Sequence, residues 1–264
     1  MTEKSLTTYL QDKKAKGQKL FIPYIVAGGS GLERLEEEIQ MLADSGATAI
    51  ELGIPFSDPV ADGPIIQKSA QQAFAHQVTF AKIVATLQKI NAPVPIILMG
   101  YANSFLHFGF ERLLKELEST DVKGLIIPDI PYEHQDLILP ALDQTDIALV
   151  QLVTLMSKKE RIEQLVKGAQ GFIYAVTVNG TTGVNQTYRA SLDKHLADIT
   201  ELSEIPVLAG FGVSERAHVD RFNTCCDGVI VGSKIVDSLA RKGVKATGEL
   251  VLNLTGNAGG GTLM

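Results

Sequence analysis

Residues 50–67 read Ile-Glu-Leu-Gly-Ile-Pro-Phe-Ser-Asp-Pro-Val-Ala-Asp-Gly-Pro-Ile-Ile-Gln, an apolar run that passes into a loop rich in proline and glycine. The run is short and almost continuously hydrophobic, which is typical of a strand buried on both faces of a parallel sheet. Two acids interrupt the pattern: Glu51 lies within the run, and Asp62 lies in the loop. The stretch therefore predicts a strand-to-helix connection with an acid on either side of its start.

The same unit, an apolar run followed by an amphipathic segment, recurs along the chain. The runs are Leu20–Val26, Thr48–Leu52, Val94–Met99, Val122–Ile127, Ile147–Val153, Gly171–Val176, Pro206–Ala209 and Gly228–Val231. Eight strands that alternate with helices fit an α/β fold of the (β/α)8 TIM-barrel type better than an open doubly wound sheet, which is the alternative. We expect a single TIM-barrel domain over residues 1–264, with a flexible glycine-rich tail at about 256–264.

The sequence also marks where two helices begin and end. Ser30-Gly-Leu-Glu33 and Ser157-Lys-Lys-Glu160 have the spacing of capping boxes, in which a serine and a glutamate satisfy exposed N–H groups of a helix. Gly46 and Gly168 fall where these two helices should end. We therefore expect a helix between each box and its glycine.

Two further features concern the ends of the barrel. Leu6, Tyr9 and Leu10 stand among charged residues, which predicts an extra N-terminal helix that caps the barrel. The connections at about 53–64 and 177–189, after the second and sixth strands, are longer than the rest. In a TIM barrel such strand-to-helix connections lie on the face where active sites assemble, so their length favours a function there.

The composition argues against several classes of protein. The chain has 264 residues, of which 45% are hydrophobic and 20% charged, and its formal charge of −6 disfavours a broad nucleic-acid-binding surface. No run approaches the roughly 18 apolar residues of a membrane span, and the polar N-terminus is unlike a signal peptide. Cys225 and Cys226 are adjacent, and no two of the five histidines have metal-ligand spacing. We expect a cytoplasmic protein with reduced cysteines and no metal.

Glu51 and Asp62 should differ in acidity. Burial disfavours an ionised carboxyl group, so the pKa of Glu51 should be raised, whereas Asp62, in a loop wetted by water, should stay ionised. Two such acids can divide acid and base roles near neutral pH. The alternatives are a core glutamate with a buried partner and an aspartate that only shapes its turn. Asp129, at the end of the fourth run, occupies a further candidate position.

Two glycine-containing motifs accompany the last two predicted strands. They read Ala209-Gly-Phe-Gly-Val-Ser-Glu215 and Gly228-Val-Ile-Val-Gly-Ser-Lys234. Glycines let backbone N–H groups approach a phosphate closely, and a helix N-terminus adds favourable partial charge. Phosphate sites of TIM barrels are frequently built by the loops after strands seven and eight. A phosphate site is therefore favoured over the alternative that these glycines only form tight turns.

Taken together, the residues resemble the tryptophan synthase alpha chain family, the indole-3-glycerol-phosphate lyases. The resemblance covers essentially the whole chain to about Lys245, and its most specific stretch is Glu51-Leu-Gly-Ile-Pro-Phe-Ser-Asp-Pro-Val-Ala-Asp-Gly-Pro64. Further matching stretches are Phe21-Ile-Pro-Tyr24, Met99-Gly-Tyr-Ala-Asn103, Pro128-Asp-Ile-Pro131, Gly171-Phe-Ile-Tyr174, Thr181-Thr-Gly183, Gly210-Phe-Gly-Val-Ser214 and Val231-Gly-Ser233.

The resemblance implies a retro-aldol cleavage of indole-3-glycerol phosphate into indole and glyceraldehyde 3-phosphate, a step of tryptophan biosynthesis. Glu51 would protonate indole C3, and Asp62 would stabilise the positive charge around the ring nitrogen and accept its proton. Glu51 would then take the proton of the glyceryl hydroxyl. Tyr174 would orient Glu51, and Thr182 would hold Asp62 when the long sixth loop closes.

The resemblance also assigns binding groups. Backbone groups at Gly183, Gly212, Gly232 and Ser233 would hold the phosphate. The walls of the indole pocket would be Phe21, Met99, Ile126, Leu152, Phe211 and Ile230. An apolar slot with a few polar anchors is also what an indole site requires.

A partner is implied as well. Members of this family work as the alpha chain of an α2β2 heterotetramer and pass indole to a beta chain, which holds pyridoxal phosphate (PLP); no cofactor is expected in this chain. Pro55, Phe56, Asp58 and Pro59, in the loop of Asp62, would contact the beta chain. The alternative is that these prolines only stiffen a solvent-facing loop.

The chain departs from the family pattern at two places. Many relatives read Gly-Asp-Pro where this chain has Gly28-Gly-Ser30, and some carry arginine at the position of Val178. Both departures bear on loop closure and partner signalling. Two other functions compete with the lyase: another phosphate-binding TIM-barrel enzyme, of the sugar-phosphate isomerase or epimerase type, and a mainly allosteric binding subunit with little activity alone.

Overall fold

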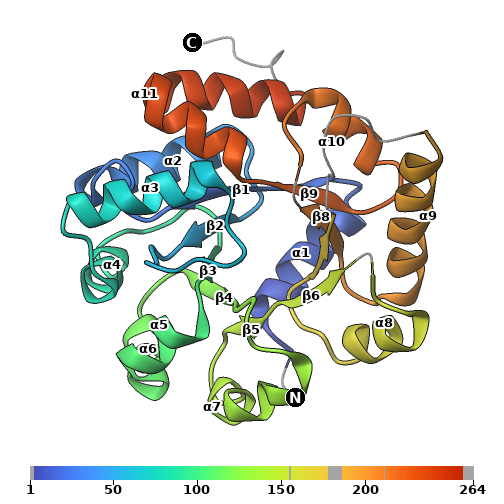
Figure 1. Ribbon diagram of the computed structural model, residues 1–264, viewed down its shortest axis with the longest axis horizontal. Helices are drawn as coiled ribbons and strands as arrows, with labels where there is room; N and C mark the ends of the chain where they lie inside the picture. Colours follow the sequence, from blue (N-terminus) through green and yellow to red (C-terminus); the bar gives the residue numbers. More distant parts are fainter. Residues whose placement is uncertain (1–2, 155, 178–185, 211, 258–264) are drawn as a thin grey trace.

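A computed structural model describes residues 3–154, 156–177, 186–210 and 212–257. Its strands form a parallel sheet surrounded by helices, and the sheet curls into a barrel (Figure 1). The strands are β1 Leu20–Val26, β2 Ile50–Gly53, β3 Ile96–Met99, β4 Val122–Ile126, β5 Ala148–Leu149, β6 Gln151–Thr154, β7 Ile173–Val176, β8 Val207–Gly210 and β9 Gly228–Val231. The predicted TIM barrel is confirmed.

The fifth predicted strand is divided in two. The strand order is β5-β4-β3-β2-β1-β9-β8-β7-β6, so β5 and β6 stand at opposite ends of the order although only Val150 separates them in the chain. β5 pairs with β4, and β6 pairs with β7. The backbone N–H of Val150 still donates to the carbonyl of Leu125 on the β4 side, at 2.9 Å. One predicted strand thus changes neighbours along its length and closes the barrel.

Most of the helices follow strands and cover the outside of the barrel, whereas α1 precedes β1 (Figure 1). They are α1 Ser5–Ala15, α2 Leu35–Asp44, α3 Pro64–Ala75, α4 Phe80–Leu87, α5 Ala102–Phe108, α6 Phe110–Leu117, α7 Leu139–Leu142, α8 Lys159–Val166, α9 Gln186–Leu202, α10 Arg216–Phe222 and α11 Ser233–Thr255, with short 3-10 helices η1 Leu32–Arg34 and η2 Tyr132–Leu137. α11 is broken at Gly243, whose φ is 75°. None of the described helices is both long and apolar enough to cross a membrane.

Side-chain alternation along the strands separates two apolar layers. On β1, Ile22 and Tyr24 point into the barrel, where they pack with residues of the other strands, whereas Phe21 and Ile25 pack between the sheet and the helices. The same period of two places Glu51 on the interior face of β2. Only every second residue of a strand can therefore reach a site inside the mouth of the barrel.

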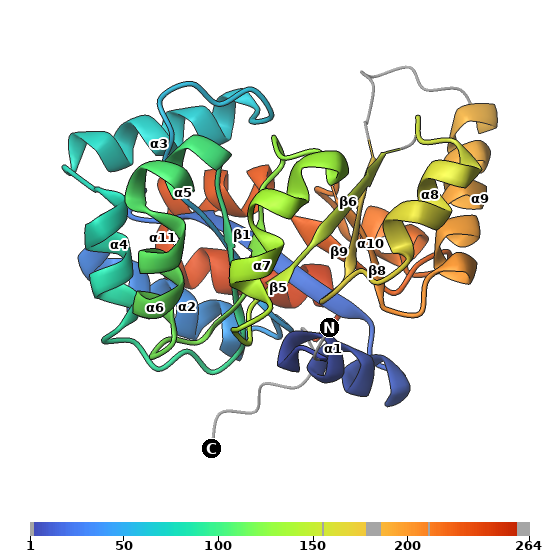
Figure 2. The ribbon, with the colours of Figure 1, turned by 90° about the horizontal axis from the view of Figure 1, so that it is seen from below.

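The predicted N-terminal helix is confirmed as α1, and it closes the bottom of the barrel (Figure 2). Leu6 and Leu10 are fully buried in the interior cluster, with Tyr9 packed against it. Gly124 of β4 leaves room for this plug, because a Cβ there would lie 2.9 Å from a methyl carbon of Leu6. The bottom is therefore sealed, and the open mouth is at the carboxyl ends of the strands.

Both predicted capping boxes are wrong, although the helices and their terminal glycines are confirmed. Gly31, with φ of 96°, precedes η1, and α2 begins only at Leu35. α8 begins at Lys159 without a side-chain cap, because the Ser157 hydroxyl lies 3.2 Å from the hydroxyl of Thr154 instead. Gly46 (φ 100°) and Gly168 (φ 73°) adopt the left-handed conformation expected at helix ends.

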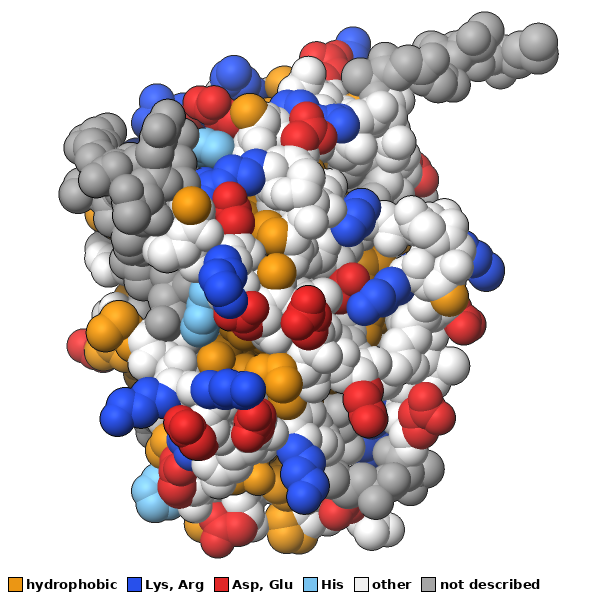
Figure 3. Space-filling model, turned by 90° about the vertical axis from the view of Figure 1, so that its right-hand side faces the viewer, with side chains coloured by type: hydrophobic (Ala, Val, Ile, Leu, Met, Phe, Trp, Pro, Cys, Tyr) orange, Lys and Arg blue, Asp and Glu red, His pale blue; other side chains and the backbone are white. Residues whose placement is uncertain are grey.

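The outer face built by α8, α9 and α10 carries charges of both signs. Lys194 pairs with Asp198, Arg216 with Asp220, and Arg221 with Asp193. Figure 3 shows basic and acidic side chains interspersed on this side of the molecule. Such a surface is solvated and mixed rather than a patch of one sign.

Candidate active site

Glu51 stands at the centre of the site. It lies on β2, points into the barrel, and is 3% exposed. Its Oε2 has no hydrogen-bond partner among the described residues. Burial, and then the neighbouring Asp62, raise the pKa of Glu51 to about 8. A carboxyl group with this pKa is mostly protonated at neutral pH, so Glu51 can donate a proton.

Asp62 lies in the connection between β2 and α3, which brings it to the carboxyl ends of the strands. The Tyr101 hydroxyl donates to its Oδ2 at 3.1 Å and accepts from the backbone N–H of Ala61 at 2.9 Å. Burial raises the pKa of Asp62, and the hydrogen bond from Tyr101 opposes that rise. Asp62 is less wetted by water than its place in a loop led us to expect: it is half-buried, and the hydrogen bond from Tyr101 favours its ionised form.

Two buried tyrosines complete the polar cluster. Tyr174 reaches the interior from β7, and Tyr24 lies opposite Glu51 in the register of β1 and β2. Burial raises the pKa of both hydroxyls well above its usual value, and the charges of Asp62 and Glu51 raise it further. Both tyrosines therefore stay neutral and can donate hydrogen bonds.

Glycines make room for these rings. A Cβ at Gly53 would lie 2.0 Å from the Tyr24 hydroxyl oxygen, and a Cβ at Gly210 would lie 2.2 Å from the Tyr174 ring. The tyrosines can fill the barrel mouth only because the adjacent strand positions carry no side chain.

Sequence reasoning missed Tyr24 and Tyr101 as site residues. Both stand in stretches that carried the family resemblance, at the ends of the β1 and β3 runs. Every second residue of β1 faces the interior, and Tyr24 is the one that pairs with Glu51. This two-residue period is the signal that would have selected Tyr24.

The proposed indole walls fall into two groups. Met99, Ile126 and Ile230 are buried in the interior cluster, with Leu152 packed against it. Phe21 does not belong with them: it lies on the opposite face of β1 and lines a cavity of about 530 Å³ at the bottom of the barrel, together with Lys19 and Thr48. Tyr24 takes its place in the interior. Phe211 lies outside the described residues.

The candidate phosphate groups lie at the ends of β8 and β9. Gly232 is the residue before α11, and Ser233 is the exposed first residue of that helix. Gly212 has a φ of 75°, which favours glycine. Thr182 and Gly183 lie outside the described residues. The start of a 23-residue helix thus faces the same barrel end as the two acids.

Asp129 has a structural role at its position. Its Oδ1 accepts the backbone N–H of Ala102 at 2.8 Å, which satisfies an N-terminal donor of α5. In the part of the chain that is described, no cluster of three or more His, Cys, Asp or Glu side chains could hold a metal ion.

The loop proposed to meet a partner is connected to Asp62 through Tyr101. Phe56 stacks on the Tyr101 ring, with centroids 5.0 Å apart and planes 28° apart. Pro55 and Pro59 are half-buried, and Asp58 is exposed. Anything that displaces Phe56 would therefore act on the tyrosine that holds Asp62.

Comparison with known proteins places this geometry in a family. The family model for the tryptophan synthase alpha chain matches residues 10–256. The chain is 50% identical to the tryptophan synthase alpha chain of Streptococcus sanguinis over 241 residues, which covers 90% of this chain and 93% of that one. For Streptococcus pneumoniae the identity is 51% over 238 residues, with 89% and 92% covered.

Solved structures agree. The alpha subunit of tryptophan synthase from Campylobacter jejuni matches with a TM-score of 0.84 and 30% identity, over 92% of this chain and 98% of that one. A tryptophan synthase structure from M. tuberculosis matches with a TM-score of 0.85 and 27% identity, over 96% and 98%. The chain therefore belongs to the tryptophan synthase alpha chain family and is a lyase that cleaves indole-3-glycerol phosphate.

Proposed function

We propose that Glu51 and Asp62 divide the chemistry of this cleavage between a neutral acid and a carboxylate. The observation that supports this division is that the two neighbouring carboxyl groups lie in different environments. Burial raises the pKa of Glu51 to about 8, while the Tyr101 hydroxyl bonds to Asp62 and favours its charge. Near neutral pH, one group is ready to give a proton and the other to stabilise a cation.

The reaction then proceeds in two proton transfers. Glu51 gives its proton to C3 of the indole ring, and Asp62 stabilises the positive charge that develops at the ring nitrogen. Glu51, now ionised, removes the proton of the hydroxyl on the neighbouring glyceryl carbon. The bond between that carbon and C3 breaks, its electron pair restores the indole ring, and an aldehyde forms. Glu51 ends protonated, so the enzyme is regenerated.

The remaining residues bind and orient the substrate. Tyr174 orients Glu51, and Thr182 would hold Asp62. Backbone groups at Gly212, Gly232 and Ser233, together with Gly183, would hold the phosphate. The indole ring would lie among Tyr24, Met99, Ile126, Leu152 and Ile230, with Phe211 as the further wall that the family resemblance implies.

The proposal includes a beta chain as partner in an α2β2 assembly, with PLP bound by the partner and none by this chain. The M. tuberculosis neighbour is described as tryptophan synthase. Val60, on the connection between β2 and α3, and Leu106, in the helix α5 that follows β3, are large apolar side chains left exposed here. Phe56, in the same connection as Val60, contacts the tyrosine that holds Asp62. As part of this proposal, the whole chain acts as one barrel domain, in the cytoplasm.

Replacement of the two acids tests the proposal. Glu51→Gln removes the proton donor and Asp62→Asn removes the charge, and each should reduce turnover of indole-3-glycerol phosphate by about a thousandfold. Asp58→Asn, in the same loop but exposed, is the matched control and should keep its turnover in the isolated chain. Binding of glycerol 3-phosphate should survive in all three variants. Near-normal turnover in a purified Glu51 or Asp62 variant would refute that residue's assignment.

A further inference from the structure

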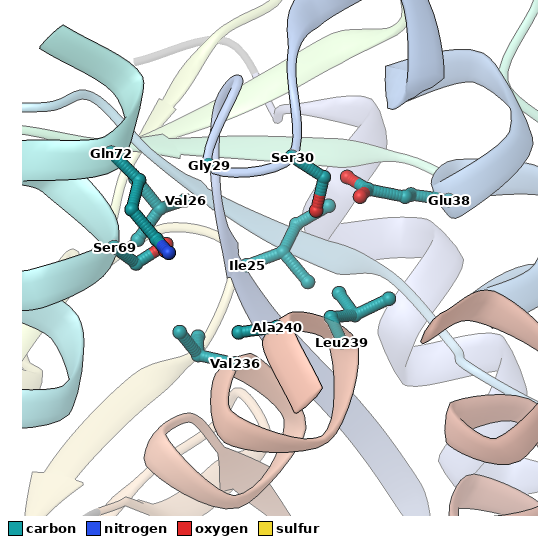
Figure 4. Close-up of a pocket in the computed structure, with 10 residues that line it drawn as sticks. All are labelled: Ile25, Val26, Gly29, Ser30, Glu38, Ser69, Gln72, Val236, Leu239 and Ala240. Atoms are coloured by element: carbon teal, nitrogen blue, oxygen red, sulfur yellow. The ribbon is translucent and has the colours of Figure 1, made fainter. Parts of the chain in front are cut away.

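Glu38 is a buried acid that the proposed reaction does not use. It lies on α2 and is 2% exposed, and its Oε1 has no hydrogen-bond partner among the described residues. The Ser30 hydroxyl faces its carboxyl group, as Figure 4 shows, and favours the ionised form. A buried carboxyl group with an unpartnered oxygen is costly to the fold, so its position calls for an explanation.

A small polar cavity lies beside Glu38. It has a volume of about 10 Å³ and is bounded by β1 and α2 and, on the far side, by α3 and α11. Ser69 and Gln72 of α3 face it from the side opposite Glu38, and Val236 of α11 closes it with an apolar wall (Figure 4). A cavity of this size accommodates one water molecule when two to four polar groups line it.

The connection between β1 and α2 packs directly on α3 at this cavity. A Cβ at Gly29 would lie 2.4 Å from the Ser69 hydroxyl oxygen, so the backbone touches that side chain. One residue earlier, the carbonyl of Gly28 lies 3.3 Å from Nδ1 of His76, just after α3. Ser30, which faces Glu38, is therefore the next residue of a segment held against α3.

The other end of α3 holds the catalytic loop. The helix begins at Pro64, two residues after Asp62. The side-chain amide of Gln67 donates to the carbonyl of Asp62 at 2.8 Å. Between Ser69 and Asp62 there are less than two helical turns, so a shift of α3 is transmitted to the loop.

We propose that Glu38 is a positioning residue for the lyase reaction: through one water molecule bound in this cavity, it links α2 and Ser30 to Ser69 and Gln72 of α3, and so fixes the loop that carries Asp62. The inference rests on the role of Asp62 proposed above. The residues of α3 that line the cavity are polar and can bond to the water molecule. By contrast, α11 contributes only the apolar residues Val236, Leu239 and Ala240. Since α11 begins at the candidate phosphate site, that site is not connected to Glu38 by hydrogen bonds through this cavity. Glu38 should therefore affect turnover rather than phosphate binding.

The charged groups that act on Glu38 lie on its own side of the cavity. Arg34, Glu33 and Glu37, which act on its carboxyl group, all belong to η1 or to α2 itself. The lining residues from β1, α3 and α11 are uncharged. Among the described residues the carboxyl group therefore has no ion-pair partner across the cavity, which agrees with a connection to α3 through a hydrogen-bonded water molecule.

Kinetics of three full-length variants test the proposal. Glu38→Leu removes the polar link at similar volume and should lower kcat by about tenfold, while inhibition by glycerol 3-phosphate stays within about twofold. Glu38→Gln keeps an oxygen for the water and should restore most of kcat. Glu36→Leu, on the exposed side of the same helix, is the matched control and should match the natural chain.

Hydrogen exchange supplies a readout that does not depend on activity. In Glu38→Leu the amides of residues 56–63 should exchange faster, with the rest of the barrel unchanged. Ser69→Ala, a smaller change from the α3 side, should act in the same direction, and the double variant should be no worse than Glu38→Leu. Unchanged kcat and loop exchange in Glu38→Leu, or faster exchange spread evenly over the chain, would overturn the positioning role.

Failure of the inference is distinguishable from failure of the proposed function. If Asp62→Asn is inactive and Glu38→Leu behaves like Glu36→Leu, only the positioning role is wrong. If Asp62→Asn keeps its turnover, the role of Asp62 itself fails, and with it the premise of the link.

Discussion

At the scale of single residues, the site depends on the protonation of two carboxyl groups in opposite senses. Glu51 must be neutral and Asp62 ionised, so the reaction should run between the two pKa values. The pKa of Glu51 is about 8, and kcat/KM should fall as the pH rises through that value. A pH profile that stays flat from 7 to 10 would contradict the assignment of Glu51 as proton donor.

Tyr101 should set the acidic limb of the same profile. Its hydroxyl lowers the pKa of Asp62, so Tyr101→Phe should raise that pKa and move the acidic limb of kcat/KM to higher pH. The alkaline limb should stay near its original position, because Tyr101 is not among the causes of the Glu51 shift. Profiles measured on both proteins provide the comparison, and an unmoved acidic limb would count against the hydrogen bond.

Glu38 should make the fold less stable as the pH rises. Burial raises its pKa to about 7, from 4.5 in the unfolded chain, so its contribution is most favourable below pH 4.5 and is lost as the pH rises through 7. Glu38→Gln cannot ionise and should be more stable than the natural chain at pH 8, by up to about 3 kcal/mol. Urea unfolding at pH 8 and pH 5 measures the difference, which should shrink at the lower pH.

Only part of the site could be predicted from single residues. Glu51 was visible because an acid within an apolar run is rare. Tyr101 was not selected, because its role arises from a contact of 3.1 Å between a β3 end and a separate loop, and no local pattern encodes that contact. Phe21 was assigned to the wrong face, because residue similarity was used without the two-residue period of β1.

At the scale of elements, most of the fold followed from the hydrophobic runs, since each buried parallel strand carries its own signal. The divided fifth strand did not, because β5 and β6 differ in their neighbours and not in their composition. The capping boxes failed for a related reason. Ser30 faces the buried Glu38 of α2, and Ser157 faces Thr154 before α8; neither contact can be seen from the spacing of a capping box.

The N-terminus of α11 carries the element-scale prediction. Gly232→Asp adds bulk and negative charge beside the proposed phosphate and should weaken binding of glycerol 3-phosphate at least tenfold, an order-of-magnitude expectation for a like charge at a helix N-terminus. Gln18→Asp is the control, since it adds the same charge at an exposed position at the far end of the barrel. Equal binding in the two variants would place the phosphate elsewhere.

At the scale of the whole molecule, the mouth of the barrel is where a partner would act on catalysis. A beta chain packed on Phe56 would fix Tyr101 through their stacked rings, and Tyr101 holds Asp62. We expect a low rate of cleavage in the isolated chain and stimulation on titration with a matching beta chain. Phe56→Ala should bind the partner with less stimulation. Binding without any change in the rate of cleavage would rule out this coupling.

The break at Val150 gives the barrel a seam, with β1 to β5 on one side in the chain and β6 to β9 on the other. The two acids belong to the first half, and the candidate phosphate groups at Gly212, Gly232 and Ser233 belong to the second. In the proposed function one substrate molecule therefore reaches across both halves, with the carbon that Glu51 protonates beside the acids of the first half and its phosphate held by the second. Binding of the substrate would therefore hold the two halves together. A barrel opened along this seam would keep Glu51 and Asp62 but would separate them from the groups proposed to bind the phosphate.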